Sequence, residues 1–387
     1  MTFVRSGSAR VGIPTDMTTV TQPRNEFFSE SIVPGPSKRR SGYIPTLDGW
    51  RAVAIIWVIE GHSRAWSYGW VSNHWIRATG YRGVQLFFSL SGFLICTRLL
   101  REEKRNGAIS LRSFYTRRLS RIQPAAMTYL FVVALLGMAG VIPCFWRGIA
   151  GASLMVRNLW PTSLAPGYWY TAHFWSLAVE EHFYLLLPGL LVLVRRRRLL
   201  MLSALALALE IWQMVVFRVP ILHEGRSWQV AQRTDVVLGG ILLGSVFAVA
   251  LTYPRWMLFA KTYLRSWVAV LIAAVLFFEL QRHHSSEVQS TIILVYPILI
   301  VATVLHADSW LGRLLELAPV RYVGRISYSL YLWQQLFFNE EEALNPHSFH
   351  SHTLLCWVGT VSCAVASYYF VETPMIRWGH RVARQMA

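Results

Sequence analysis

Long apolar blocks alternate with short polar and basic stretches along most of the chain. A helix that crosses the hydrocarbon core of a bilayer needs about 20 largely apolar residues. Ten segments meet this requirement, with boundaries good to a few residues: 47–65, 84–100, 123–142, 173–194, 199–217, 233–252, 264–280, 289–306, 325–339 and 353–371. The pattern therefore predicts an all-α integral membrane protein with about ten transmembrane helices.

The composition favours a membrane protein over a soluble one. Of the 387 residues, 54% are hydrophobic and 15% are charged, whereas about 25% of the residues of soluble domains are charged. The net charge of +17 does not indicate a nucleic acid partner, because the basic residues lie in loops between apolar blocks. The four cysteines form no CxxC pair, so we interpret them as small core residues and expect no metal site.

The distribution of Lys and Arg predicts the orientation in the membrane, because cytoplasmic loops are enriched in these residues. The stretch between the second and third predicted spans contains eight of them: Arg98, Arg101, Lys104, Arg105, Arg112, Arg117, Arg118 and Arg121. Alternating outward from this stretch places residues 38–40, residues 195–198 and the basic residues from Arg377 onward on the same side. We therefore expect both termini in the cytoplasm and a location in the cytoplasmic (inner) membrane.

The same pattern divides the chain into three parts. Residues 1–42 are rich in Ser, Thr, Pro and Arg and lack an apolar core. This composition is typical of a disordered cytoplasmic tail rather than a cleavable signal peptide. We expect residues 43–377 to form the transmembrane domain and residues 378–387 to form a short basic cytoplasmic tail.

The first predicted span carries Arg51 and His62. Eleven residues of helix make three turns, so both side chains project from one face about 16 Å apart along the axis. Histidine titrates near neutral pH and accepts a proton from a hydroxyl, which favours His62 as a general base. The alternative is that Arg51 reaches the inner headgroups and His62 marks the outer interface. The span alone does not separate these interpretations.

Glu180 and Glu181 lie in the fourth predicted span. A carboxylate inside a membrane is costly unless it is paired or hydrated, so its presence indicates function. One of the two is expected to orient or charge-stabilise an imidazole. Adjacent helical residues point about 100° apart, so the two cannot face the same partner. The alternative is a structural ion pair with Arg51, Arg118 or Arg121.

Arg118 and Arg121 share a helical face just before Pro124. Paired guanidinium groups suit phosphate recognition, as the phosphates of coenzyme A would require. The alternative is simple anchoring at the cytoplasmic face. In the second predicted span, the small residues Ser89, Ser91 and Gly92 permit close helix packing or a groove.

Taken together, these segments resemble the membrane-bound O-acyltransferases of the acyltransferase-3 family, which includes bacterial acetylases of O-antigen, peptidoglycan and exopolysaccharide. The resemblance runs from about residue 43 to residue 377. It is carried by LDGWRAVAIIWVIEGH (47–62), GVQLFFSLSGFLI (83–95), RRLSRIQP (117–124), FWSLAVEEHFYLLLP (174–188), GRISYSLYLW (324–333) and SYYFVETPMIR (367–377).

The chain departs from the family pattern at two of these positions. Gln is common in the family where His182 stands here. The family often has His after YLW, and Gln334 follows Trp333 in this chain. This second departure puts any role of that position in doubt, but it does not touch the pair of Arg51 and His62.

The resemblance also implies catalytic roles. His62 would be the catalytic base, and Arg51 would position the donor or stabilise charge. One of Glu180 and Glu181 would support the histidine. The acceptor would be a hydroxyl of a cell-envelope carbohydrate or of a glycosylated natural product that enters from the outer side.

For the acyl donor, the resemblance implies acyl-CoA, in the first place acetyl-CoA, as a co-substrate, with no permanently bound cofactor. Arg118 and Arg121, with the neighbouring Arg117, would hold the phosphates of coenzyme A. The main alternative function is a multi-pass transporter of a small anion or lipid, which would also use buried Arg, His and Glu. The sequence contains no inverted repeat and no matched pair of interrupted helices to support it.

Overall fold

The computed structural model describes residues 2, 43–63, 73–159, 165–219, 222, 227–282, 286–339 and 352–386. The side chains of 73–78, 227–228 and 276–292 are outside this description. All the described helices belong to one compact unit, Ser37–Ala387. The predicted tail, 1–42, lies almost entirely outside the described residues.

The described part of the chain is helical and contains no β-strand, which confirms the all-α prediction. The first half comprises α1 (Pro45–His62), α2 (Asn73–Asn106), α3 (Leu111–Met138), α4 (Trp146–Ser153), the 3-10 helix η2 (Arg157–Leu159), α5 (Trp169–Ala172), α6 (Phe174–Leu193) and α7 (Arg198–Arg218).

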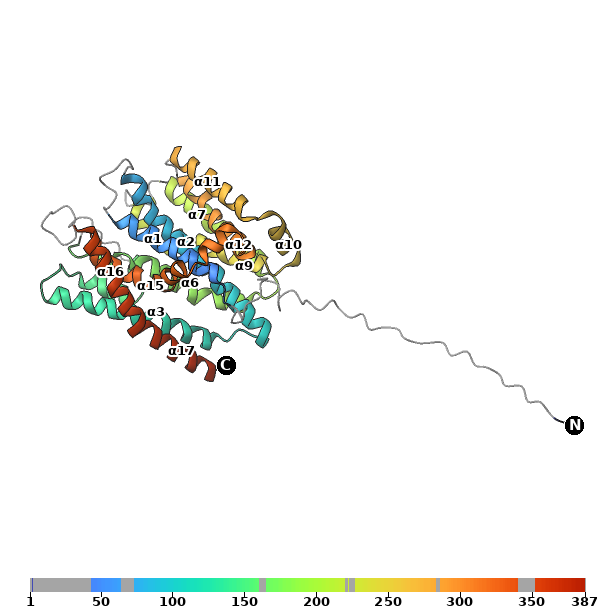
Figure 1. Cartoon of the computed structure of the whole chain (residues 1–387), viewed down its shortest axis with the longest axis horizontal. Coiled ribbons are helices and arrows are strands. Elements are labelled where there is room, and N and C mark those ends of the chain that lie inside the picture. The colour runs from blue at the N-terminus through green and yellow to red at the C-terminus, as the bar shows by residue number, and fades with distance from the viewer. Residues whose placement is uncertain are drawn as a thin grey trace. The chain divides into compact units, whose positions relative to one another are not determined.

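The second half follows the same all-helical pattern. It comprises α8 (Ser227–Val230), α9 (Thr234–Ala250), α10 (Pro254–Tyr263), α11 (Ser266–Arg282), α12 (Ser286–Leu305), α13 (Trp310–Leu315), α14 (Ala318–Arg325), α15 (Ser327–Phe337), α16 (Thr353–Ser367), the π-helix η6 (Tyr368–Glu372) and α17 (Thr373–Gln385). The helix α17 runs beside α3 (Figure 1).

Local sequence explains where several of these helices begin. The helix α1 starts at Pro45 after the extended residue Ile44, and α10 starts at Pro254 after the extended Tyr253. Proline suits the first helical position, because its fixed φ is already helical and its missing N–H is not needed there. Ser110 precedes α3, and its hydroxyl accepts a hydrogen bond from the backbone N–H of Ser113 at 3.4 Å, as an N-terminal cap does.

Each of the ten predicted spans coincides with a helix of the structure, but fewer helices qualify as spans by length and composition. Among the described residues, five helical segments qualify: 79–106, 111–138, 169–193, 198–218 and 353–385. The pair α9 and α10, bent by 105° at its break, raises the number to six. The protein is therefore a multi-pass membrane protein by these features, and the number ten and the orientation of the termini stay predictions.

Two predicted spans fall short for visible reasons. The helix α1 carries Asp48, Arg51 and Glu60 within its 18 residues, and α15 is only 11 residues long. The C-terminal residues predicted as a short tail instead continue α17 as far as Gln385.

Small residues join α2 and α9. A Cβ atom at Gly92 would collide with the carbonyl group of Ile241, and one at Gly244 would collide with the carbonyl oxygen of Ser89. The hydroxyl of Ser245 donates a hydrogen bond to the Gly92 carbonyl at 3.2 Å. Of the two expectations for the small residues of this segment, close packing therefore holds for Gly92.

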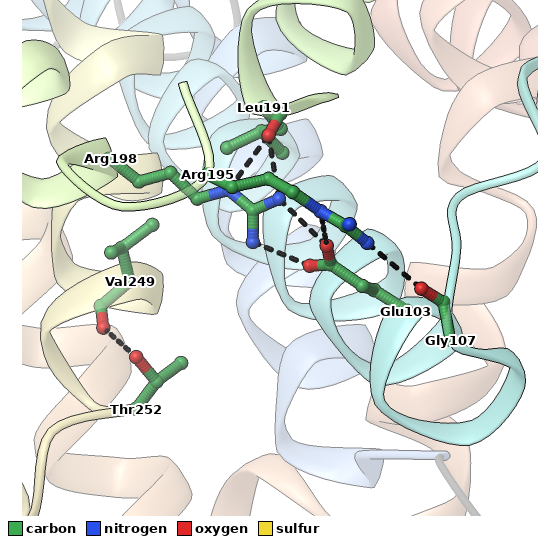
Figure 2. A network of polar contacts seen from close by, with 7 residues as sticks. All are labelled: Glu103, Gly107, Leu191, Arg195, Arg198, Val249 and Thr252. Carbon is green, nitrogen blue, oxygen red and sulfur yellow. Dashed lines mark hydrogen bonds and ion pairs between the residues drawn. The ribbon is translucent and has the colours of Figure 1, made fainter. Parts of the chain in front are cut away.

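The end of α2 is tied to the turn between α6 and α7 by the cluster shown in Figure 2. The carboxylate of Glu103 accepts hydrogen bonds from Arg195 at 2.8 Å and from Arg198 at 2.5 Å. The guanidinium of Arg198 also donates to the carbonyl of Leu191 at the end of α6. Arg195 and Arg198 therefore hold the turn between α6 and α7 against the end of α2. They also contribute to the positive charge of the loop.

Candidate functional site

A small polar cavity lies where α1, α2, α6 and α15 meet. Its volume is about 50 Å³, which is room for a very small number of water molecules. Both apolar and polar side chains line it: Arg51, Val84, Phe87, Ser91, Ser176, Leu177, Glu180, Ser327, Tyr328 and Tyr331. The cavity thus brings together two of the predicted site residues, Arg51 and Glu180, inside the helical bundle.

Glu180 lies in a set of polar groups at this cavity. Its carboxylate accepts a hydrogen bond from the hydroxyl of Tyr184 at 2.6 Å. The positive charges of Arg118 and Arg51 act on the same carboxylate. Because α6 advances one turn between residues 180 and 184, the phenol and the carboxylate lie on one face of the helix.

Arg118 is buried at this place, with 9% of its surface exposed. Its guanidinium carbon lies 4.4 Å from the centre of the Tyr184 ring and 6.0 Å from that of Phe114. The charge of Arg121 acts on both Arg118 and Arg51. Arg51 and Arg118 therefore lie near Glu180, and Arg121 lies near these two arginines.

Arg117 is placed differently from its neighbour Arg118. Its guanidinium forms an ion pair of 2.8 Å with Glu102 of α2. Successive residues of a helix point about 100° apart, so Arg117 and Arg118 face different partners. Glu181 stays with the cluster, because the charges of Arg118 and Glu180 act on it.

His62 lies on the same face of α1 as Arg51, at the C-terminal end of the helix. Its Nδ1 lies 2.8 Å from the carbonyl oxygen of Val58. A carbonyl oxygen only accepts hydrogen bonds, so Nδ1 carries the proton and Nε2 is the basic nitrogen of the neutral ring. The imidazole packs edge-on against Trp169, with ring centres 5.4 Å apart.

A pair of glutamines holds Trp169 in this position. The indole N–H of Trp169 donates to the backbone carbonyl of Gln335 at 3.0 Å, and the amide of Gln335 donates to the Trp169 carbonyl at 3.0 Å. The amide of Gln334 donates to the side-chain oxygen of Gln335 at 2.8 Å. Gln334, which departs from the family pattern, thus supports Gln335 and through it Trp169, the residue against which His62 packs.

The contacts of Glu180 join it to a tyrosine and to arginines, and its expected support of His62 stays a prediction. Glu180 is bonded to Tyr184 and lies under the influence of arginines. Along α6, Glu180 is seven residues, or about 10 Å, from His173. The ring of His173 lies within the electrostatic influence of His62. The carboxylates therefore belong to the arginine end of the site.

Sequence reasoning missed a polar stripe on α6. His173, Ser176, Glu180 and Tyr184 follow one another at intervals of three or four residues, which places them on one helical face. Tyr331 of α15 meets this stripe, because its hydroxyl lies 2.6 Å from that of Ser176. The helical spacing was available in the sequence, whereas the partner from α15 was not.

The sequence of this chain matches the acyltransferase domain of the acyltransferase-3 family over residues 44–370. The peptidoglycan O-acetyltransferase OatA of Listeria monocytogenes is 29% identical over 368 residues, which is 87% of this chain and 56% of that protein. A putative peptidoglycan O-acetyltransferase, YrhL, of Bacillus subtilis is 29% identical over 379 residues, covering 88% and 56%.

A putative O-acetyltransferase of Staphylococcus aureus (strain COL) is 27% identical over 371 residues, covering 88% of this chain and 58% of that protein. The chain thus spans little more than half the length of these relatives. No solved structure matches it.

Proposed function

This chain belongs to the acyltransferase-3 family, and we propose that it transfers an acetyl group from acetyl-CoA to a hydroxyl of a cell-envelope polymer. The names of the relatives support O-acetyl transfer, and those of Listeria monocytogenes and Bacillus subtilis support peptidoglycan as the acceptor. The donor is inferred from the arginines of the chain itself.

The observation that carries the proposal is the polar cavity inside the bundle. Arg51, Glu180, Ser176 and Tyr331 all line it. The hydroxyls of Ser176 and Tyr331 also bond to the carbonyl oxygen of His173, which follows Trp169, the residue that packs against His62, by four residues. A membrane interior keeps such a connected set of polar groups only at a cost, which favours a catalytic use.

In the proposed reaction the arginine cluster binds the donor. Arg118 and Arg121 receive the phosphates of coenzyme A, because guanidinium groups make charge-assisted hydrogen bonds to phosphate oxygens. Arg51 lines the cavity itself and stabilises negative charge on the donor. Arg117, already paired with Glu102, contributes less.

The chemical step uses His62. Its Nε2 removes the proton from the acceptor hydroxyl as the oxygen attacks the thioester carbon. A C–O bond forms, the C–S bond breaks, and the proton passes from the imidazolium to the departing thiolate. The products are the O-acetyl ester and coenzyme A with a free thiol.

Inside-out membrane vesicles that contain the protein test this reaction class. They are incubated with acetyl-CoA labelled in the acetyl group, and label bound to envelope polymer is measured before and after mild alkali. The proposal predicts bound label that mild alkali releases, because esters are alkali-labile and amides are not. Vesicles without the protein are the control. Bound label that survives alkali, or equal label without the protein, would refute O-acetyl transfer.

A further inference from the structure

The imidazole of His173 is buried at the start of α6. Only 4% of the residue surface is exposed. Neither ring nitrogen has a hydrogen-bond partner among the residues that the structure describes. Buried polar groups in proteins are almost always satisfied, so an exception calls for an explanation in function.

The position of this imidazole is fixed by other contacts. Its ring packs against Tyr129, Phe174 and Tyr331, with ring centres 5.2 Å, 4.8 Å and 5.5 Å away. Its carbonyl oxygen accepts hydrogen bonds from Tyr331 at 2.9 Å and from Ser176 at 3.3 Å. The ring is therefore held in place without the use of its nitrogens, which is how a preorganised donor is built.

His173 lies close to the proposed base. His62 and Arg157 are both near enough to influence it electrostatically. Trp169, one helical turn before His173, packs against the ring of His62. Two residues that contact His173, Ser176 and Tyr331, also line the polar cavity. His173 thus contacts two residues of the cavity through its carbonyl oxygen, and it follows by four residues the indole that packs against His62.

The surroundings favour a neutral ring. The aromatic rings of Tyr129, Phe174 and Tyr331 pack against His173, and the nearby guanidinium of Arg157 would repel a second positive charge. A charge buried in such a place is costly. A neutral imidazole carries one N–H group, which donates a hydrogen bond but supplies no charge.

We propose that His173 donates this N–H to the carbonyl oxygen of the acyl thioester. The inference rests on the proposed function and adds the donor that the reaction needs. As the acceptor oxygen attacks, the carbonyl oxygen gains negative charge, and a hydrogen bond to it stabilises the tetrahedral intermediate. The charge returns to the carbonyl when the C–S bond breaks, so His173 neither gains nor loses a proton. The ligand of this site is thus the acyl carbonyl.

A structural histidine in the same helix shows the contrast. His182 lies nine residues further along α6, and its Nδ1 is 2.8 Å from the hydroxyl of Thr234. A histidine that serves only to pack has its polar atoms satisfied in this way. His182 therefore provides a matched control on the same element.

The experiment compares His173→Phe, His173→Asn and His173→Gln with His182→Phe in the vesicle assay with labelled acetyl-CoA. Phenylalanine keeps the aromatic bulk and removes the N–H, whereas each amide keeps an N–H near one of the two ring nitrogens. We expect His173→Phe to lower kcat roughly 100- to 1,000-fold, as loss of one oxyanion donor does, with the KM for acetyl-CoA changed less than about threefold. One of the amides recovers at least about tenfold of that loss, and His182→Phe stays within about threefold of the wild type.

The variants are compared at equal amounts of folded protein. A kcat of His173→Phe within about threefold of the wild type overturns the proposal, and so do two amide variants as inactive as His173→Phe. If His173→Phe does not fold, the two amide variants carry the test, and one of them must exceed His173→Ala about tenfold in kcat. A wild type without any acetyl transfer refutes the proposed function itself, which separates that failure from a failure of the role of His173.

Discussion

At the scale of single residues, the site is split between two ends of the face that α1 presents. Arg51 meets Glu180 and the cavity at one end, and His62 meets Trp169 at the other. With three turns of helix between them, the two residues are about 16 Å apart along the axis. A donor whose phosphates bind near Arg51 must therefore reach across this distance, as the extended pantetheine arm of coenzyme A does.

Replacing neighbouring arginines of α3 separates donor binding from simple positive charge. Arg118 is buried against Tyr184, and Arg117 is paired with Glu102. We expect Arg118→Ala to raise the KM for acetyl-CoA about tenfold or more, the loss typical of a charge-assisted hydrogen bond. Arg118→Lys recovers only part of this loss, because Lys keeps the charge but not the planar group.

Arg117→Ala is the matched control, with a KM changed less than about threefold. The measurement is the initial rate of label transfer at varied acetyl-CoA. Equal effects of Arg117→Ala and Arg118→Ala would show that the charge of the loop matters and the position does not.

At the scale of helices, close contacts decide which elements pack. Gly92 and Gly244 let α2 and α9 approach until each backbone lies against the other. Ser91, next to Gly92, lines the cavity on the side of α6. Adjacent residues of α2 face different neighbours. The contact of Gly92 with α9 therefore sets the position of Ser91 at the cavity.

The glycines of the structure offer a matched test of this packing. A Cβ at Gly92 would collide with the carbonyl of Ile241, whereas a Cβ at Gly189 of α6 would have no atom within 4 Å. We expect Gly92→Ala to destabilise the protein by about 1–3 kcal/mol, as overpacking does. Gly189→Ala stays neutral or stabilises, because Ala favours the helix by about 1 kcal/mol. Thermal unfolding in detergent measures both, and equal stability of the two variants would contradict the close contact.

The part of this arrangement that the sequence predicts is the part set by helical periodicity. The eleven-residue spacing of Arg51 and His62 indicates one face of α1, and the small residues near Gly92 indicate close packing. The meeting of α6 with α15 depends on tertiary packing, so the contacts of His173 with Tyr331 could not be predicted from spacing. The pairing of Arg117 with Glu102 was missed for the same reason.

At the scale of the whole molecule, the number of spans shows a limit of hydropathy. Each of the ten apolar blocks coincides with a helix, but within the described part of the chain five or six helical segments satisfy length and composition. Charged residues lower the apolar character of α1, because its 18 residues include Asp48, Arg51 and Glu60. Charged residues thus remove α1 from the helices that satisfy the criterion, whereas α2, α3 and α6, which also contribute to the candidate site, satisfy it.

The orientation of α3 provides a direct test of the topology. Its 28 residues correspond to about 42 Å, more than the thickness of about 30 Å of the hydrocarbon core. Single cysteines are introduced at the exposed positions Asn106 and Ala139 before and after it, in a parent in which the four native cysteines are replaced. A membrane-impermeant maleimide is expected to label Ala139→Cys in intact cells and Asn106→Cys only after permeabilisation.

Each alternative result has its own meaning. Labelling with the sides reversed would contradict the cytoplasmic placement of the arginine-rich stretch. Labelling of both cysteines in intact cells would show that α3 does not cross the membrane. The parent without cysteines is the control for background.

The proton transfer by His62 is the central claim, and one comparison tests it most directly. Vesicles with the wild type, His62→Gln and His182→Gln are assayed for transfer of label from acetyl-CoA at equal protein amounts. The account predicts that His62→Gln loses roughly 100- to 10,000-fold in kcat, as loss of a general base does, while His182→Gln stays within about threefold of the wild type. Transfer by His62→Gln at a rate close to that of the wild type would contradict the account.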